Sequence, residues 1–233
     1  MDVSLLDQLN RDRADRKPVA LVTQIDTGAQ ALVHPHDATG MLAANADVVA
    51  AARKAMADDK SGVVESPAGN LFIQVFNPPL RLIVVGAVHI AQPLARMAVL
   101  SGYDVTVVDP RGSFATAERF PGVTLMGEWP DDAMAALKPD KRTAVVTLTH
   151  DPKLDDPALA VALKSDAFYV GSLGSRKTHA ARCERLTAQG FDGKDLARIH
   201  GPVGLDIGAV SPAEIAVSIL GQVTEVLHAK DAA

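Results

Sequence analysis

The sequence predicts an α/β protein with a smaller α+β domain at residues 1–77 and a larger domain at residues 78–233, built on a mostly parallel, doubly wound sheet. In the larger part, short β-branched and apolar runs alternate with helix-length segments, as strands and crossover helices do. In the smaller part, strand patterns surround one Ala-rich helix. Between the two stand Pro78 and Pro79, which lack backbone donors and predict a stiff linker.

The N-terminal domain is predicted to contain helices and a strand hairpin in a mixed order. The alternating charges of residues 11–17 favour a solvated surface. The expected elements are a weakly amphipathic helix at 3–9, strands at 19–25 and 31–33, a helix at 47–56, and strands at 62–65 and 71–76.

The C-terminal domain is predicted to alternate strands and helices to its end. Its last helix has the clearest start, because Ser211-Pro212-Ala213-Glu214 is a capping-box pattern with Pro at the first helical position. The expected strands are 81–85, 104–109, 123–126, 143–148 and 167–170, and the expected helices are 89–100, 132–137, 158–163, 175–189 and 211–228.

The first turn of this domain is similar to a dinucleotide-binding fingerprint. G-x-G-x-x-G appears as Gly86-x-Val88-x-x-Ala91, and Asp109 follows at about the 20-residue distance at which an acid binds the ribose hydroxyls. Ala at the third position is tolerated, whereas Val88 obstructs the approach of the backbone to the phosphates. The pattern therefore indicates a Rossmann-like fold more strongly than it indicates an NAD site. The alternative that the domain has kept the fold but does not bind a dinucleotide stays open.

Four polar segments stand at the predicted carboxyl ends of strands, where open α/β sheets bind ligands, and a glycine-rich loop follows near the end of the chain. Together they supply the candidate cofactor-binding residues: Gly86, Ala87, Val88, His89, Asp109, His150, Asp151, Gly171, Ser172, Gly174, Ser175, Arg176, Lys177 and Asp206.

These segments allow different chemistry. The segment 171–177 has the glycines, hydroxyls and cations of an anion cradle before a helix, although a glycine-rich turn with solvated basic residues has the same composition. Three roles stay open for His150 and Asp151: an acid–base pair, a pair of metal ligands, or a structural turn. In the structural turn, Asp151 bonds the backbone before Pro152. Asp206, among the glycines of 201–209, either bonds backbone amides or faces a ligand.

Composition excludes several classes of function. A net charge of −5 over 233 residues, without a long basic run, makes nucleic acid an unexpected partner. Cys183 is the only cysteine, so no disulfide framework or cysteine zinc site is predicted, and we expect a cytoplasmic protein. No apolar run is long enough for a membrane span, and the first residues do not have the pattern of a signal peptide. His34 and His36 lack a third ligand type nearby, so no metal site is predicted.

Several ordered motifs resemble one family. They are Pro79-Leu80-Arg81-Leu82 before the turn 86–91, Thr149-His150-Asp151, the segment 169–177, and Gly204-Leu205-Asp206-Ile207-Gly208-Ala209 before Pro212-Ala213-Glu214-Ile215-Ala216. Together they are similar to the xanthine dehydrogenase accessory family (XdhC/CoxI) over residues 78–226. The resemblance implies a C-terminal Rossmann domain, binding of molybdopterin cofactor, and delivery of that cofactor to a molybdenum hydroxylase apoenzyme. The family's usual N-terminal Gly-Gly-Cys motif is absent, since its counterpart at 39–45 contains no cysteine.

Three hypotheses follow. The first is a cytoplasmic accessory protein that holds the phosphate of a molybdopterin cofactor at the helix N-termini of 86–89 or 171–177, near Asp109, His150 and Asp206. The second is an oxidoreductase that binds NAD, in preference to NADP, through Asp109 and uses His150 as acid–base. The third is a protein-binding module that has lost its ligand. The composition does not decide whether the chain forms a homodimer.

Overall fold

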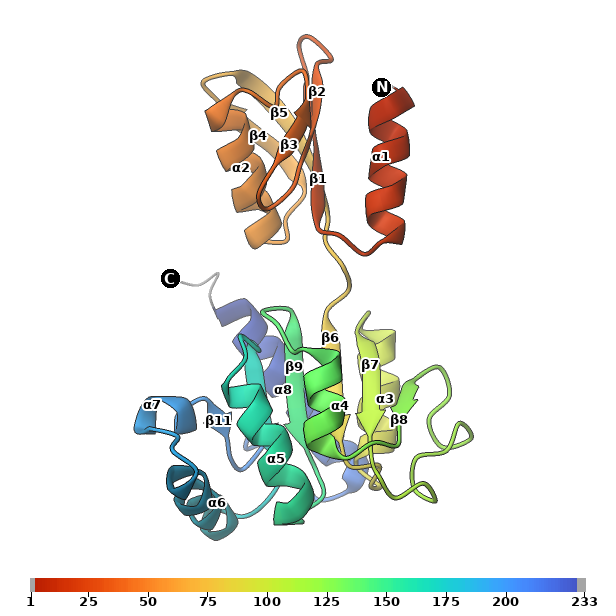
Figure 1. Ribbon diagram of the computed structural model, residues 1–233, viewed down its shortest axis with the longest axis vertical. Coiled ribbons are helices and arrows are strands. Elements are labelled where there is room, and N and C mark those ends of the chain that lie inside the picture. Colours follow the sequence, from red (N-terminus) through yellow and green to blue (C-terminus); the bar gives the residue numbers. More distant parts are fainter. Residues whose placement is uncertain (1–2, 230–233) are drawn as a thin grey trace. The chain divides into compact units, whose positions relative to one another are not determined.

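The structure is a computed structural model, which describes residues 3–229 and divides into two compact units (Figure 1). The first unit ends at Pro78 and the second begins at Pro79, one residue from the predicted boundary. None of the helices within residues 3–229 is long and apolar enough to cross a membrane.

The N-terminal unit is a five-stranded antiparallel sheet with the strand order β3-β2-β1-β5-β4. Its elements are α1 (Val3–Ala14), β1 (Val19–Gln24), β2 (Gln30–Val33), β3 (Ala38–Gly40), α2 (Ala46–Ala57), β4 (Gly62–Ser66) and β5 (Gly69–Phe76). The short edge strand β3 was not predicted, and α1 continues five residues beyond its predicted end, into the charged stretch.

Successive residues of β1 supply two separate cores, because side chains alternate between the faces of a strand. Ala20 and Val22 pack with α2 residues such as Ala52 on one face, whereas Val19 and Leu21 pack with Leu9 of α1 on the other. Asp12, on the stretch predicted to be solvated, is buried, and its carboxylate accepts a bond from His34 Nε2 at 2.9 Å. The prediction that residues 11–17 form a solvated surface is therefore wrong for Asp12.

The C-terminal unit is a six-stranded, wholly parallel sheet with the order β11-β10-β9-β6-β7-β8. Its elements are β6 (Arg81–Val85), α3 (Ala91–Leu100), β7 (Asp104–Val108), β8 (Thr124–Met126), α4 (Pro130–Leu137), β9 (Thr143–Thr147), α5 (Pro152–Leu163), β10 (Tyr169–Ser172), α6 (Arg176–Ala188), α7 (Gly193–Leu196), β11 (Ile199–His200) and α8 (Pro212–His228). Numbered within the unit, this is the order 3-2-1-4-5-6 of dinucleotide-binding folds, with its topological switch point between β6 and β9.

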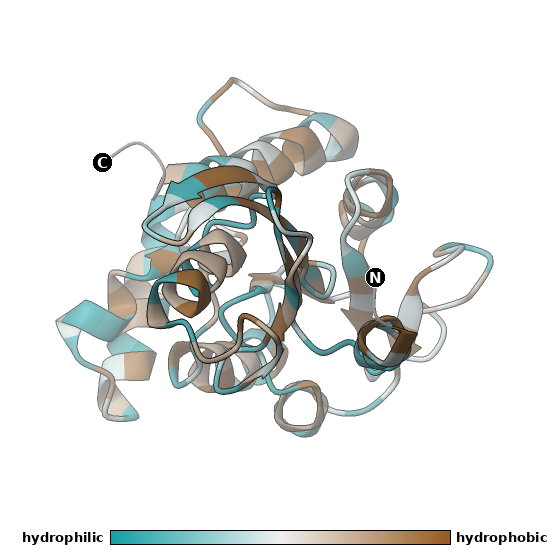
Figure 2. Cartoon of the chain, turned by 90° about the horizontal axis from the view of Figure 1, so that it is seen from above, coloured by the Kyte–Doolittle hydropathy of each residue, from teal (hydrophilic) through white to brown (hydrophobic). Residues whose placement is uncertain are grey.

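Helices cover both faces of this sheet. Alternate residues of β6 divide between the two faces: Leu82 and Val84 lie in the core formed with α3 and α8, and Ile83 and Val85 lie in the core with α4, α5 and α6. Along the helices, hydrophobic and hydrophilic segments alternate in Figure 2, as amphipathic helices require. The predicted doubly wound α/β fold is confirmed.

Helix boundaries differ from the prediction at two functional turns. α3 begins at Ala91 and not at His89, because residues 88–90 form a turn. α5 begins at Pro152, six residues before its predicted start. Asp151 caps the helix and accepts a bond from Lys153 N at 2.9 Å, and the helix continues through Pro157. The short elements α7 and β11 were not predicted.

Candidate functional site

The loops after β6 and β9 touch at the switch point of the C-terminal sheet. Gly86 has a φ of +108°, a conformation that residues with a side chain rarely adopt. A Cβ added there lies only 2.6 Å from Thr149 Cγ2 and 3.3 Å from Thr149 N. Gly86 is therefore required both by its backbone conformation and by the close approach of the neighbouring loop.

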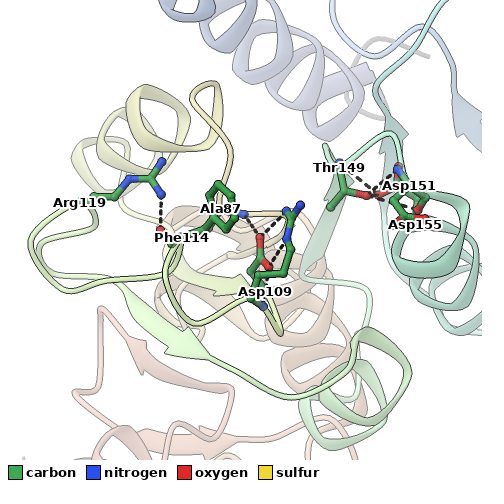
Figure 3. A network of polar contacts seen from close by, with 8 residues as sticks. Ala87, Asp109, Phe114, Arg119, Thr149, Asp151 and Asp155 are labelled. Carbon is green, nitrogen blue, oxygen red and sulfur yellow. Dashed lines mark hydrogen bonds and ion pairs between the residues drawn. The ribbon is translucent and has the colours of Figure 1, made fainter.

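Asp109, at the end of β7, is completely buried and holds the Gly86 turn (Figure 3). Its Oδ2 accepts from Ala87 N and from Arg111 Nη2, both at 2.8 Å, and its Oδ1 accepts from Arg111 N and Nε, both at 2.9 Å. Burial alone raises the pKa of Asp109, but the bonds from Arg111 and Ala87 outweigh it and hold the pKa below its ordinary value. With no exposed surface, Asp109 positions the turn and presents no acceptor to solvent.

Arg111 presents the exposed charge of this cluster. The Arg111 side chain is 39% exposed, and its guanidinium carbon lies 4.7 Å from the centre of the Phe114 ring. The bonds to Asp109 raise the pKa of Arg111, so it is cationic. No role was assigned to Arg111 from the sequence. The feature that could have identified it is its position two residues after an acid at the end of a predicted strand.

The other two residues of the Gly86 turn lie in different environments. The half-buried Val88 packs against the core formed with α3 and α8, whereas His89 is exposed. The branched side chain at the middle position of the fingerprint is thus accommodated by packing.

The loop after β9 carries a second buried acid, Asp155, which the sequence pattern did not single out. Asp155 Oδ1 accepts from Thr149 Oγ1 at 2.7 Å and from Thr149 N at 3.2 Å (Figure 3). Burial raises the pKa of Asp155 despite these bonds and despite the charge of Arg182. Asp151 has the structural role that was one of the three alternatives, as the N-cap of α5. His150 is exposed and has a φ of +61°, which is uncommon for a residue with a side chain.

The loop after β10 leads into α6. Ser172 is buried and bonds the Thr147 hydroxyl at 2.5 Å, so it is a structural residue in this conformation. Gly171 has no room for a Cβ beside Tyr169 and Val203, and Gly174 has a φ of +143°. Ser175 caps α6 by accepting from Thr178 N at 3.1 Å. The exposed Arg176 and Lys177 form the first turn of the helix.

Arg182, on α6, lies beneath this loop and was missed by sequence reasoning. It is 2% exposed, and its Nη2 donates to Leu173 O at 2.8 Å. Its Nε and Nη1 have no hydrogen-bond partner among the described residues. Burial lowers the pKa of Arg182, against the charges of Asp155 and Asp156. Only its tertiary position reveals it, because an arginine in a charged helix predicts a solvated residue.

Asp206 lies exposed in the loop between β11 and α8. No backbone amide among residues 3–229 donates to its carboxylate, so it does not organise this loop in the way that one alternative proposed. Within the same residues, no group of three or more His, Cys, Asp and Glu side chains is placed to hold a metal ion. His34 lies between two carboxylates, with Nε2 2.9 Å from Asp12 and Nδ1 2.8 Å from Asp37.

The strand order and the glycine turn at the switch point define a domain of the Rossmann type. Residues 82–223, more than half of the chain, match the XdhC Rossmann domain, and the chain belongs to that family. The resemblance seen in the sequence motifs is confirmed.

Curated relatives carry names from molybdenum enzyme biology. The chain is 34% identical over 158 residues to a Bacillus subtilis protein named as a probable xanthine dehydrogenase subunit, covering 67% of this chain and 46% of that protein. It is 32% identical over 157 residues to the "Molybdenum cofactor insertion chaperone PaoD" of Escherichia coli, covering 67% and 43%. The chain thus spans less than half the length of these relatives.

A crystal structure described as a xanthine dehydrogenase from Bacillus halodurans is similar over nearly the whole chain. The TM-score is 0.75 at 25% sequence identity, with 99% of this chain and 69% of that chain covered. The antiparallel N-terminal sheet and the parallel C-terminal sheet therefore occur together in another protein.

Proposed function

We propose that this protein is an accessory protein for a molybdenum hydroxylase of the xanthine dehydrogenase type. It binds molybdopterin cofactor at the carboxyl edge of the C-terminal sheet and aids its insertion into the apoenzyme. Membership of the XdhC family and the name of the relative PaoD support the biological setting. The structural observation that carries the proposal is the internal use of Asp109.

The bonding of Asp109 favours one of the two classes of ligand. In an NAD site, the acid at the end of the second strand accepts the hydroxyls of the adenosine ribose. Here that carboxylate is fully buried and accepts four hydrogen bonds from its own chain. The preference for NAD over NADP, which relied on a repulsive free carboxylate, loses its basis because Arg111 neutralises it. A phosphorylated pterin needs no ribose acceptor.

The residues at the edge fit a phosphorylated heterocycle held away from its metal. Arg111 and the α6 N-terminus offer cationic and amide donors, and the Thr149–Asp155 loop and Asp206 offer acceptors nearby in the same unit. When bound, the cofactor supplies the molybdenum that the client enzyme uses. The only cysteine, Cys183, lies on α6 with its Sγ 3.6 Å from His179 Nε2, so this chain has no cysteine in the segment 39–45 to act on the metal.

The test is retention of the ligand by the purified protein. Protein and molybdopterin are mixed under anaerobic conditions and desalted, and the retained pterin is measured by its fluorescence after oxidation. We expect retention close to one pterin per chain and no binding in a parallel fluorescence titration with NADH. Absence of pterin retention contradicts the proposal; NADH binding in its place supports the oxidoreductase, and binding of neither ligand supports the protein-binding module.

The insertion step needs its own measurement. Pterin-loaded protein is mixed with a cofactor-free hydroxylase of the xanthine dehydrogenase type, and recovery of hydroxylase activity is compared with that obtained from free molybdopterin. Faster or fuller recovery with the loaded protein is expected. Equal recovery would limit the protein to cofactor storage.

A further inference from the structure

The helices α3, α4, α5, α6 and α8 begin at the carboxyl edge of the C-terminal sheet, and their N-termini differ in charge. α4 has Asp131 and Asp132 in its first turn, and α8 has Glu214. α5 begins with its own carboxylates, Asp151 as the cap and Asp155 in the first turn. Before α3, the Ala87 amide is already bonded to Asp109. The first turn of α6 has no acid and carries Arg176 and Lys177. A helix N-terminus favours an anion, and only that of α6 adds cations to that preference without an adjacent acid.

A second feature points to a ligand at α6. The Arg182 guanidinium is buried directly beneath the loop, bonded to Leu173 O and 3.6 Å from the position of a Cβ on Gly174. Two of its three nitrogens have no partner within the described residues. Buried charges are normally paired and fully hydrogen-bonded.

The neighbouring acids do not pair directly with Arg182. Asp156 forms an ion pair with Arg185, with Nη2 3.0 Å from Oδ1. Asp155 is bonded to Thr149, and neither acid forms an ion pair with Arg182 among the described residues. A guanidinium with two nitrogens that have no partner among residues 3–229 thus lies under the loop 173–177, where Gly174 has a φ of +143°.

We propose that the α6 N-terminus, with the exposed Arg176 and Lys177 in its first turn and the buried Arg182 against the loop, is the subsite for a phosphate monoester dianion. Arg182 is a positioning residue: it holds Leu173 and adds its charge to the field at the free amides of the helix. The identity of the ligand as the phosphate of molybdopterin rests on the proposed function; inorganic phosphate shares the same chemistry. The Gly86 turn then contacts another part of the ligand, or none.

The main test compares two charge reversals at the same sheet edge. Lys177→Glu changes the proposed subsite, and Lys153→Glu makes the same change in net charge at the N-terminus of α5. Binding of inorganic phosphate is followed by NMR shifts of backbone amides, and molybdopterin by retention after desalting. We expect Lys177→Glu to weaken both by about tenfold or more, the effect of losing one charge-assisted bond, and Lys153→Glu to change either less than about threefold.

The role of Arg182 is tested by a conservative and a neutral substitution. Arg182→Lys is expected to keep most of the phosphate-dependent shifts of the Arg176 and Lys177 amides, whereas Arg182→Met is expected to lose them. Thermal unfolding checks that each variant is folded. If Arg182→Met fails to fold, the comparison between Lys177→Glu and Lys153→Glu decides the proposal alone.

The outcomes separate this subsite from the proposed function. Phosphate binding that depends on Lys177, without pterin retention by the unaltered protein, supports the subsite and contradicts the cofactor. Pterin retention that survives Lys177→Glu, with no phosphate shifts at α6, overturns the subsite and leaves the cofactor. Equal effects of the two charge reversals also overturn it, because they would show a general field of the edge.

Discussion

Asp109 and Asp155 are two buried acids at one edge of one sheet, and their surroundings drive their pKa values in opposite directions. Asp109 accepts a two-pronged bond from Arg111 and an amide bond from Ala87, and its pKa is lowered. Asp155 accepts from the neutral Thr149 and is not paired with Arg182, and its pKa is raised. Two acids whose surroundings shift their pKa values in opposite directions often have different roles. Asp109 fastens the Gly86 turn as a carboxylate, whereas burial makes ionisation of Asp155 less favourable.

The largest expected effect comes from forcing apart the two loops that these acids hold. Gly86→Val places a branched side chain at a φ of +108° and against Thr149. We expect a loss of about 3 kcal/mol or more in the free energy of unfolding, measured with urea. Gly112→Ala is the matched control, because a Cβ there meets nothing within 4 Å, and it should change stability by less than about 0.5 kcal/mol. Similar losses for both would show that the loops do not depend on this contact.

The second largest effect is expected from the removal of the Asp109 carboxylate, which holds the Gly86 turn. Asp109→Ala leaves the buried Ala87 amide without its acceptor and frees Arg111, and a loss of about 2 kcal/mol is expected. Asp104→Ala, at the opposite end of the same strand β7, is the comparison; it has a half-buried side chain and should cost less. An equal cost for the two would remove the special role of the Asp109 cluster.

The pH dependence of stability should show the two acids with opposite signs. The folded-state pKa of Asp109 lies below its unfolded value, so its stabilisation is present above the unfolded pKa and is lost as the pH falls through the folded pKa. Asp155 has a raised folded-state pKa, so its ionisation costs stability as the pH rises above the unfolded value of about 3.8. The fall in the free energy of unfolding that begins as the pH rises above about 3.8 is therefore expected to be smaller in Asp155→Asn, as measured by urea unfolding at a series of pH values. An unchanged profile would contradict the raised pKa.

The smallest effect concerns the strained residue between the loop and α5. His150→Gly should stabilise the fold by about 0.5 kcal/mol, because glycine adopts the φ of +61° without steric cost. Differential scanning calorimetry measures this change. If the strain serves the ligand, pterin retention will fall while stability rises; if both stay constant, His150 has neither role.

The sequence was sufficient for the order of the elements other than the short β3, α7 and β11, and for the edge of the C-terminal sheet at which the polar residues lie. Gly86, Asp109 and Ser211 were placed correctly, because a strand end, a glycine and a capping pattern are local features. Asp155 and Arg182 were missed, since their importance comes from burial against the loops that precede their own helices, which a charge pattern does not show. The predicted start of α5 was wrong, because the Asp151 cap begins the helix at Pro152.

Only a three-dimensional structure could reveal whether a motif residue was already engaged. Asp109 lies where an acceptor for the ribose hydroxyls is expected, but its carboxylate already accepts a hydrogen bond from Arg111, two residues later. Sequence spacing fixes the position of a side chain along the edge, but its bonding depends on rotamers and on neighbours from other strands.

The strand order of the C-terminal unit also has a consequence for how the protein forms during synthesis. β6 is the first strand of this unit to leave the ribosome, yet it lies at the centre of the sheet, and both strands that flank it, β7 and β9, are made later. The sheet grows outward first to β8 and then to β11, so its carboxyl edge is complete only when nearly the whole chain has emerged. The N-terminal unit, by contrast, has all five of its strands once Phe76 has been made. The carboxyl edge of the parallel sheet is therefore completed later than the whole of the N-terminal sheet.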